Sequence, residues 1–346
     1  MKKILAMLLA LVMILSLAAC ASTPAADTPA ESTSTTETPV SETPASAEET
    51  PAAEGKTYTV GVCQLVQHEA LDAATQGFVD ALTEELGDAV TIDVQNASGE
   101  SVNCGTIING FVSRGVDLIM ANATPALTAA VSATADIPIL GTSITAYGVA
   151  LDLDDFNGTV GGNVSGTSDL ADLQKQAQMI LDWFPETKNV GLLFCSAEPN
   201  SRYQIDEVRK ALEAQGVTCE EFAFTDSNDV SSVTQKAADF SDVVYIPTDN
   251  TAASNTEAIA NVLIPAGVPA ICGEEGLCRG CGVATLSISY YDLGVTTGKM
   301  AAKILKGEAD ISEMPVEYTD ATPKYNASIC DQLGITPLDG YEAIEG

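Results

Sequence analysis

The 346-residue sequence has few positive charges: 15 Lys and Arg stand against 48 Asp and Glu, which gives a net charge of −33. This balance argues against binding to nucleic acid and against electrostatic attachment to an anionic surface. There is only one histidine, His68, and no G-x-S-x-G elbow, P-loop or G-x-G-x-x-G motif stands in the setting that those motifs need. Because a hydrolase needs a nucleophile, a base and an orienting group, we expect a protein that is not an enzyme and needs no cofactor.

Long apolar runs are also absent, apart from Ile4–Leu17 near the start of the chain. This run follows two lysines and precedes Ala18-Ala19-Cys20, a pattern typical of an export signal rather than of a spanning helix. The cysteine directly after the small residues predicts a lipoprotein signal peptide over 1–19, with Cys20 as the lipidated N-terminus after cleavage. An ordinary secretory signal with a chance cysteine is the alternative. We therefore expect a lipid-anchored protein on the extracytoplasmic face of the cell membrane.

Residues 20–55 have almost no large apolar side chains and no Lys or Arg, and they are rich in Ala, Thr, Ser, Pro and Glu. Such a segment cannot bury enough surface to offset the entropy of ordering it, so we expect a disordered, acidic and proline-rich tether. The remainder of the chain, from about residue 57, is long enough for two lobes rather than one core.

From Thr57 onward, short apolar runs alternate with helical patterns. The first series has predicted strands at 57–63, 90–94, 117–121 and 137–140, with helices at 70–86, 106–113 and 125–134. The second has strands at 190–194, 218–223, 243–246, 269–272 and 283–287, with helices at 172–183, 202–215, 230–238, 252–265 and 291–305. Shorter pieces follow at 315–318 and 328–333. The alternation predicts parallel sheets covered by helices, and its repetition predicts two similar α/β lobes.

Polar residues gather at the predicted carboxyl ends of these strands, which is where open parallel sheets bind ligands. Thr124 and Asn200-Ser201 stand at helix starts that are suited to hold a carboxylate. Asp249 and Glu274 are suited to neutralise an ammonium group, and the pair Tyr290-Tyr291 to stack on a flat group. Ser, Thr, Asn and Asp are also common helix N-caps, so helix capping is the alternative to ligand binding for these residues.

Three of the nine cysteines, Cys272, Cys278 and Cys281, form a C-x5-C-x2-C pattern on what we expect to be a glycine-rich loop. Zinc and iron–sulfur sites usually have four ligands at typical spacings, and only three cysteines stand here. We therefore expect plain thiols or one local disulfide, and no metal. Most of the other cysteines are expected to be small buried apolar residues.

Several motifs, in this order along the chain, resemble the tryptophan/tyrosine-type substrate-binding lipoproteins of ABC importers. They are Gln64-x-x-Gln67-His68-x-x-Leu71-Asp72, Ala123-Thr124-Pro125-Ala126, Asn163-Val164-Ser165-Gly166-x-Ser168-Asp169, Asn200-Ser201, Ser227-Asn228-Asp229-Val230, Pro247-Thr248-Asp249-Asn250 and Tyr290-Tyr291-Asp292-Leu293-Gly294-x-x-Thr297-Gly298-Lys299-Met300-Ala301. The resemblance covers about residues 57–337. It implies a type I periplasmic-binding fold, in which two Rossmann-like lobes are joined by a hinge of three crossovers and close on a ligand. The implied lobes are 57–165 with 289–320, and 166–288 with 321–346.

The resemblance also implies a ligand pocket and partners. By motif, the pocket falls on Gln64, Gln67, Thr124, Ser168, Asp169, Asn200, Ser201, Asp249, Asn250 and Tyr290. One departure is Gln67, where the family usually has glutamate. The implied ligand is an amino acid, in particular an aromatic one, and the implied partner is a permease with a separate ATPase; we expect the binding protein itself to be a monomer. The alternatives are a ligand sensor, a nucleoside or heterocycle binder, and an extracytoplasmic enzyme on the same scaffold with His68 as its best candidate residue.

Overall fold

The structure is a computed structural model that describes residues 56–344. The chain divides into two units, Met1–Ala52 and Ala53–Gly346, and the described residues all belong to the second. The expected signal peptide, Cys20 and the expected tether lie outside the described residues, so these expectations stay predictions. None of the described helices combines the length and apolar character that a membrane crossing requires.

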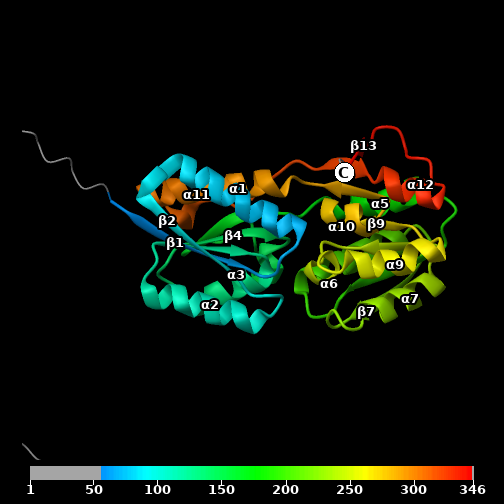
Figure 1. Ribbon diagram of the computed structural model, residues 1–346, viewed down its shortest axis with the longest axis horizontal. Helices are drawn as coiled ribbons and strands as arrows, with labels where there is room; N and C mark the ends of the chain where they lie inside the picture. The colour runs from blue at the N-terminus through cyan, green and yellow to red at the C-terminus, as the bar shows by residue number, and fades with distance from the viewer. Residues whose placement is uncertain (1–55, 345–346) are drawn as a thin grey trace, which may run out of the picture. The chain divides into compact units, whose positions relative to one another are not determined.

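The first lobe is built on a six-stranded sheet (Figure 1). Its strands are β1 (Tyr58–Gln64), β2 (Val90–Asn96), β3 (Leu118–Asn122), β4 (Ile139–Ile144), β5 (Val164–Ser168) and β11 (Glu317–Tyr318). Its helices are α1 (Glu69–Leu86), α2 (Ser101–Arg114), α3 (Thr124–Ala133), α4 (Tyr147–Ala150) and α11 (Tyr290–Lys306), with single 3-10 turns at Gly87–Ala89 and Ile311–Glu313. The strand order is β11-β5-β4-β3-β1-β2, and all neighbouring strands are parallel. Helices cover both faces, since Phe111 of α2 packs in one apolar cluster and Phe78 of α1 in another.

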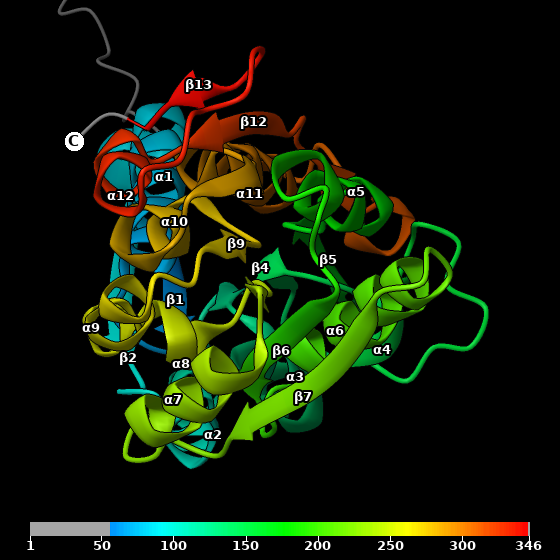
Figure 2. The ribbon, with the colours of Figure 1, turned by 90° about the vertical axis from the view of Figure 1, so that its right-hand side faces the viewer.

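The second lobe is built on a seven-stranded sheet, which faces the viewer in Figure 2. Its strands are β6 (Asn189–Cys195), β7 (Thr218–Phe224), β8 (Val243–Ile246), β9 (Ala270–Cys272), β10 (Ala284–Ser287), β12 (Thr322–Tyr325) and β13 (Glu342–Ala343). Its helices are α5 (Leu173–Trp183), α6 (Pro199–Glu213), α7 (Val230–Phe240), α8 (Asn250–Ala253), α9 (Thr256–Ala266), α10 (Glu275–Cys281) and α12 (Ala327–Leu333). The strand order is β13-β12-β10-β9-β8-β6-β7, and β10 and β12 are antiparallel, which departs from the expected all-parallel sheet.

The two lobes repeat one topology. The order β2-β1-β3-β4-β5 in the first sheet matches β7-β6-β8-β9-β10 in the second, which confirms the predicted pair of similar α/β lobes. In each sheet the first strand lies between the second and the third, so the winding direction changes there. Open α/β sheets bind their ligands at such a switch point, outside the carboxyl ends of the strands.

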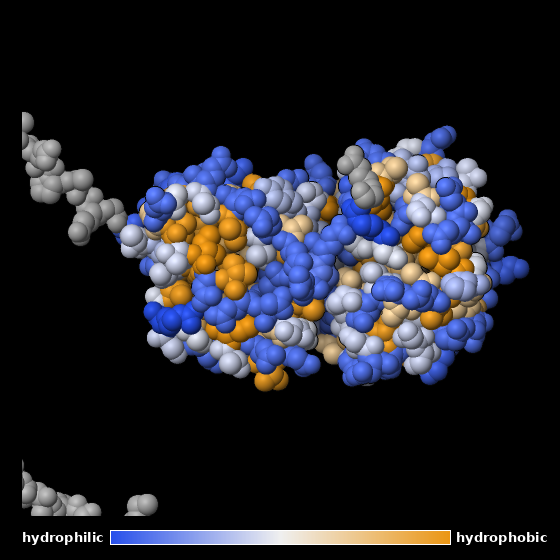
Figure 3. All heavy atoms as spheres, viewed as in Figure 1, coloured by the Kyte–Doolittle hydropathy of each residue, from blue (hydrophilic) through white to orange (hydrophobic). Residues whose placement is uncertain are grey.

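Three crossovers connect the lobes, as the type I periplasmic-binding fold requires: β5 leads to α5, β10 leads to α11, and β11 leads to β12. The implied boundary between 165 and 166 falls inside β5, whereas those at 288/289 and 320/321 fall in the connecting segments. On the face shown in Figure 3, hydrophilic residues predominate along the boundary between the lobes, and hydrophobic patches lie on each lobe. A boundary of this polarity suits lobes that separate and rejoin.

Close packing of α1 against α11 fixes the edge of the first lobe that faces the second. A Cβ added to Gly77 would collide with the carbonyl oxygen of Tyr291, and one added to Gly294 with that of Ala74. Glycine at these two positions therefore lets the helix backbones touch. The consequence is that the N-terminal ends of α1 and α11, marked by His68 and Tyr290, are held at fixed positions relative to each other.

Two helix boundaries differ from the prediction in ways that affect the site. Helix α6 begins at Pro199 rather than at 202, because proline at the first helical position loses no hydrogen bond. Asn200 and Ser201 consequently lie in the first turn. The helix predicted over 252–265 is two helices, α8 and α9, since the Asn255 side chain donates to the Thr251 carbonyl oxygen at 2.7 Å and so satisfies an end of α8.

The expectation of a glycine-rich loop at Cys272–Cys281 is wrong, because residues 275–281 form helix α10. The carboxylate of Glu274 starts this helix by accepting from the backbone N–H groups of Gly276 and Leu277, at 2.6 and 2.5 Å. Glycine at 280 serves close packing, since a Cβ there would collide with Thr256 of α9. The eight described cysteines are free thiols, and all except Cys219 are buried, as predicted for small apolar residues. No group of three or more potential ligands within residues 56–344 could hold a metal ion.

Candidate functional site

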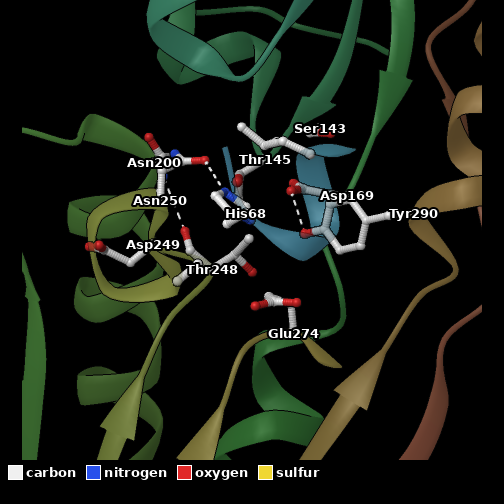
Figure 4. A pocket seen from close by; sticks show the side chains of 12 residues that line it. His68, Ser143, Thr145, Asp169, Asn200, Thr248, Asp249, Asn250, Glu274 and Tyr290 are labelled. Atoms are coloured by element: carbon white, nitrogen blue, oxygen red, sulfur yellow. Dashed lines mark hydrogen bonds between the residues drawn. The ribbon is translucent and has the colours of Figure 1, made fainter. Parts of the chain in front are cut away.

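A narrow cavity, with a free volume of about 10 Å³, lies between the lobes at the carboxyl ends of both sheets (Figure 4). From the first lobe and the crossover after β5 it is lined by His68, Leu71, Ser143, Thr145, Asp169 and Tyr290. From the second lobe it is lined by Asn200, Thr248, Asp249, Asn250, Ala253 and Glu274. Most of the lining residues follow or end a strand, and Leu71 and Ala253 lie in α1 and α8, so the topology of the two sheets brings the polar ones together.

Four buried side-chain atoms of this cavity have no hydrogen-bond partner: His68 Nδ1, Ser143 Oγ, Asp169 Oδ1 and Asn200 Oδ1. Buried polar atoms are paired in nearly all folded proteins, so a cluster of unpaired ones calls for a ligand or ordered water. The carboxylate and amide oxygens can only accept a hydrogen bond, and the hydroxyl can do either. A ligand that fits this cavity must therefore provide mainly hydrogen-bond donors.

Asp169 lies directly after β5 and is held by Tyr290, the first residue of α11. The Tyr290 hydroxyl donates to Asp169 Oδ2 at 2.9 Å, which leaves Oδ1 unpartnered (Figure 4). Burial raises the pKa of Asp169 above its usual value, while the hydrogen bond from Tyr290 acts in the opposite direction. A buried carboxyl group of this kind is stabilised in its charged form by a cation placed next to it.

The first turn of α6 contributes a second polar wall. Asn200 Nδ2 donates to the Thr248 carbonyl oxygen at 3.1 Å and to Glu198 Oε2 at 3.2 Å, so its Oδ1 is the free atom. The residue before the helix, Glu198, gives the first turn no side-chain cap. Uncapped N–H groups at the start of a 15-residue helix carry partial positive charge and attract a carboxylate.

Asp249 and Glu274 line the cavity, but their oxygens already accept hydrogen bonds. Asp249 accepts from the backbone N–H groups of Cys195 and Ala252, at 2.7 and 2.8 Å, and caps α8. Burial raises the pKa of Asp249 to about 8 and that of Glu274 to about 7. Among the described residues that line the cavity there is no Lys or Arg. The site is thus rich in carboxyl groups with raised pKa and lacks a balancing cation.

Of the ten residues assigned to the pocket by motif, the structure brings five to the cavity: Asp169, Asn200, Asp249, Asn250 and Tyr290. The other five do not line it. Gln67 is exposed. Gln64 is buried in contacts within its own lobe, with Asp72 and Thr75. Thr124, Ser168 and Ser201 are buried beside helix starts or the crossover, and Ser168 donates to the Thr145 carbonyl oxygen.

Other lining residues were outside the predicted pocket, although most stood at predicted strand ends. His68, Thr248 and Glu274 follow β1, β8 and β9, and Ser143 lies near the end of β4, so their positions at strand ends indicated a place at this edge. Nothing in the sequence indicated Thr145, Leu71 and Ala253 as pocket residues, since they are ordinary residues of a loop or helix. Tyr291, considered together with Tyr290 as a stacking group, faces solvent instead: it is 43% exposed and its hydroxyl donates to Asp80.

Comparison with known proteins places this geometry in a family. The model of the ABC transporter substrate binding protein family matches residues 59–340. The chain belongs to this family. A curated relative, the tyrosine-binding protein of Clostridioides difficile (strain R20291), is 33% identical over 273 residues, which cover 77% of this chain and 78% of that protein.

Two solved structures of similar proteins differ in ligand state. The ABC domain from Streptococcus pneumonia in complex with L-Trp is 32% identical, with a TM-score of 0.79 over 84% of this chain and 100% of that one. A ligand-free, open substrate-binding protein with adhesive properties from Clostridium difficile is 34% identical, with a TM-score of 0.64 over 84% of this chain and 99% of that one. At similar identity, the structure of this chain is more similar to the L-Trp complex than to the ligand-free, open structure.

Proposed function

We propose that this substrate-binding protein captures an aromatic amino acid for an ABC importer, in the cavity between its lobes. The proposal is supported by a tyrosine-binding relative and by the similarity to a structure that holds L-Trp. The observation that carries it is the set of unpartnered buried acceptors, Asp169 Oδ1 among them, that faces a closed cavity without a cation. An amino acid provides the donors that these atoms lack.

The two charged ends of a zwitterion fit different walls of the cavity. The ammonium group donates to Asp169 Oδ1, whose carboxylate supplies the opposite charge that a buried cation needs. The carboxylate of the ligand lies at the uncapped first turn of α6, near Asn200. The free space of about 10 Å³ in the cavity is roughly that of one water molecule, so the lobes must move apart to admit even a single amino acid, and a peptide would need a still larger opening.

Ligand capture works through closure of the lobes. Asp169 and the α6 wall lie on opposite sides of the crossover, so a ligand that binds both favours the closed form over the open one. Two direct contacts also join the lobes in the closed form: His68 with Asn250, and Glu69 with Arg279. The closed protein then docks on a permease whose separate ATPase drives transport, and it makes or breaks no covalent bond.

The proposed cellular setting follows from the N-terminal sequence. Residues 1–19 direct export, Cys20 carries the lipid, and residues 20–55 tether the binding lobes to the outer face of the membrane. Metabolic labelling with a radioactive fatty acid tests this, with Cys20→Ala as the variant that loses the label. Label retained by Cys20→Ala would contradict the anchor without affecting the ligand proposal.

Titration calorimetry of the full chain against the twenty amino acids tests the ligand. We expect 1:1 binding of L-tryptophan or L-tyrosine and no heat with acidic amino acids, because the cavity already contains three carboxyl groups and no Lys or Arg lines it. Small-angle scattering with and without the bound amino acid should show compaction. Absence of heat with every aromatic amino acid would rule out the proposal.

A further inference from the structure

We infer that His68 determines specificity by presenting a neutral Nδ1 acceptor to an N–H or O–H donor of the ligand, and that Asn250 and Glu198 from the other lobe hold the imidazole in the required tautomer. The inference rests on the proposed function, and it names what one residue of that site demands of the ligand.

Glu198 fixes the orientation of the Asn250 amide. The carboxylate of Glu198 accepts from Asn250 Nδ2 at 2.7 Å and from the Asn250 backbone N–H at 3.0 Å. It also accepts from the backbone N–H and hydroxyl of Thr251, at 2.9 and 2.8 Å. A carboxylate surrounded by donors leaves only one choice for the Asn250 amide: its NH₂ faces Glu198 and its oxygen faces away.

Asn250 in turn fixes the tautomer of His68. Its Oδ1 lies 3.3 Å from His68 Nε2, across the boundary between the lobes (Figure 4). Because this oxygen can only accept, Nε2 must carry the hydrogen. In a neutral imidazole the other nitrogen, Nδ1, is then an acceptor.

The ring is neutral and its free nitrogen is buried. Burial lowers the pKa of His68, against the raising effects of Asn250 and of the carboxylates of Glu198 and Asp72. Nδ1 has no partner within the described residues, and His68 lines the cavity. A buried acceptor without a partner costs free energy, so the cavity favours a ligand that donates to it over an isosteric ligand that does not.

Two ligand groups have this chemistry: the ammonium group, and the donor of an aromatic side chain, which is the indole N–H of tryptophan or the hydroxyl of tyrosine. L-Phenylalanine separates them, because it keeps the ammonium group and lacks the side-chain donor. The comparison of L-phenylalanine with L-tyrosine and L-tryptophan therefore shows which donor meets Nδ1.

A matched pair of substitutions tests the acceptor. In His68→Asn the amide oxygen takes the place of Nδ1, whereas in His68→Gln the amide takes the place of Nε2 and no atom remains at Nδ1. We expect His68→Gln to weaken binding about 10- to 100-fold, as expected for a buried donor or acceptor left unpaired, and His68→Asn to retain most of the affinity. If His68→Gln loses affinity for L-tyrosine and L-tryptophan but not for L-phenylalanine, the side-chain donor of the ligand meets Nδ1. If it loses affinity equally for all three, the ammonium group meets Nδ1. Equal affinities of the two variants overturn the inference.

Nitrogen NMR tests the tautomer directly, because the chain has a single histidine and its two ring nitrogens are therefore assigned without ambiguity. The full chain, without a histidine tag, is labelled with ¹⁵N-histidine and saturated with the amino acid found by calorimetry. We expect the Nε2–H pattern at pH 7, and a change toward a mixture of tautomers in Asn250→Ala, which a purely structural role of Asn250 would not produce. An Nδ1–H or imidazolium pattern in the wild-type complex overturns the inference even though the proposed function stands. If no amino acid binds, the proposed function and the inference about His68 are both wrong.

Discussion

At the scale of single residues, Asp169 is the side chain whose charge matters most for the proposed ligand. Its Oδ2 is held by the Tyr290 hydroxyl and its Oδ1 has no partner. We expect Asp169→Asn to weaken binding of L-tryptophan or L-tyrosine by about 30-fold or more, because an ammonium group would be buried without its opposite charge. Calorimetry measures the loss.

The control for Asp169→Asn is a ligand rather than a second variant. An analogue without the amino group, such as indole-3-propionate, has no cation for Asp169 to neutralise, so its weaker binding should be unchanged or improved in Asp169→Asn. A similar loss for both ligands would assign Asp169 a role in the fold instead. Asp249→Ala is a poorer test, because Asp249 also accepts from two backbone N–H groups and starts α8.

Which polar residues reach the cavity could be predicted only in part. Asp169, Asn200, Asn250 and Tyr290 stand at strand ends, and the parallel topology sends all strand ends of a sheet to one edge. Whether a side chain at that edge points into the cavity depends on local hydrogen bonds that a motif does not show. Gln64 illustrates this: its amide is used by Asp72 and Thr75 of α1, so it stabilises its own lobe.

At the scale of elements, the ends of α1 and α10 form an ion pair between the lobes. Arg279 of α10 donates through Nε to both carboxylate oxygens of Glu69 at 3.0 Å, and it also pairs with Glu275 at 2.9 Å. The Glu69 side chain is 51% exposed and that of Arg279 34% exposed, so solvent screens the pair. We expect Glu69→Gln to favour the open form slightly and to raise the Kd of the amino acid about two- to five-fold.

A similar pair within one lobe serves as the control for Glu69→Gln. Lys306 of α11 and Glu85 of α1 lie 2.7 Å apart, with side chains 30% and 42% exposed, and both belong to the first lobe. Glu85→Gln should change ligand affinity little, because the open and closed forms both contain this pair. If both variants weaken binding equally in calorimetry, the effect is one of general charge and not of the contact between α1 and α10.

The elements themselves were predictable where a hydrophobic run has clear ends. The strand predicted at 243–246 is β8 with the same bounds, since all four of its residues are buried. Helix α10 was not predictable as a helix, because its two glycines disfavour helix, and the reason for Gly280 lies in packing against α9. Strand β12 was also missed: it contains Pro323 and pairs antiparallel with β10, so it follows neither the βαβ alternation nor the usual strand composition.

At the scale of the whole molecule, closure on a cationic group couples ligand binding to protons. Burial raises the pKa of Asp249 to about 8 and that of Glu274 to about 7, and it also raises the pKa of Asp169. In the ligand-free closed cavity Asp249 and Glu274 therefore hold protons near neutral pH. An ammonium group in the cavity favours their ionised forms and lowers their pKa values, so binding releases protons.

The sign of the pH dependence follows from these shifts. Because the folded-state pKa values of Asp249 and Glu274 lie above those of the unfolded chain, their contribution to stability is fully present below about pH 4 and is lost as the pH rises through 7 and 8. The bound ligand recovers part of this loss. We therefore expect the affinity for L-tryptophan or L-tyrosine to increase from pH 5 to pH 8, while the free energy of unfolding of the ligand-free protein decreases over the same range.

Calorimetry in two buffers of different ionisation enthalpy, such as phosphate and Tris at pH 7, counts the protons directly. The observed enthalpy should depend on the buffer with the sign of proton release, and Glu274→Gln should reduce that dependence, since it removes the acid with a pKa of about 7. The same titration with indole-3-propionate should release fewer protons, because it brings no cation into the cavity. An enthalpy independent of the buffer, or proton uptake with the amino acid, would show that the carboxyl groups do not sense the ligand's charge.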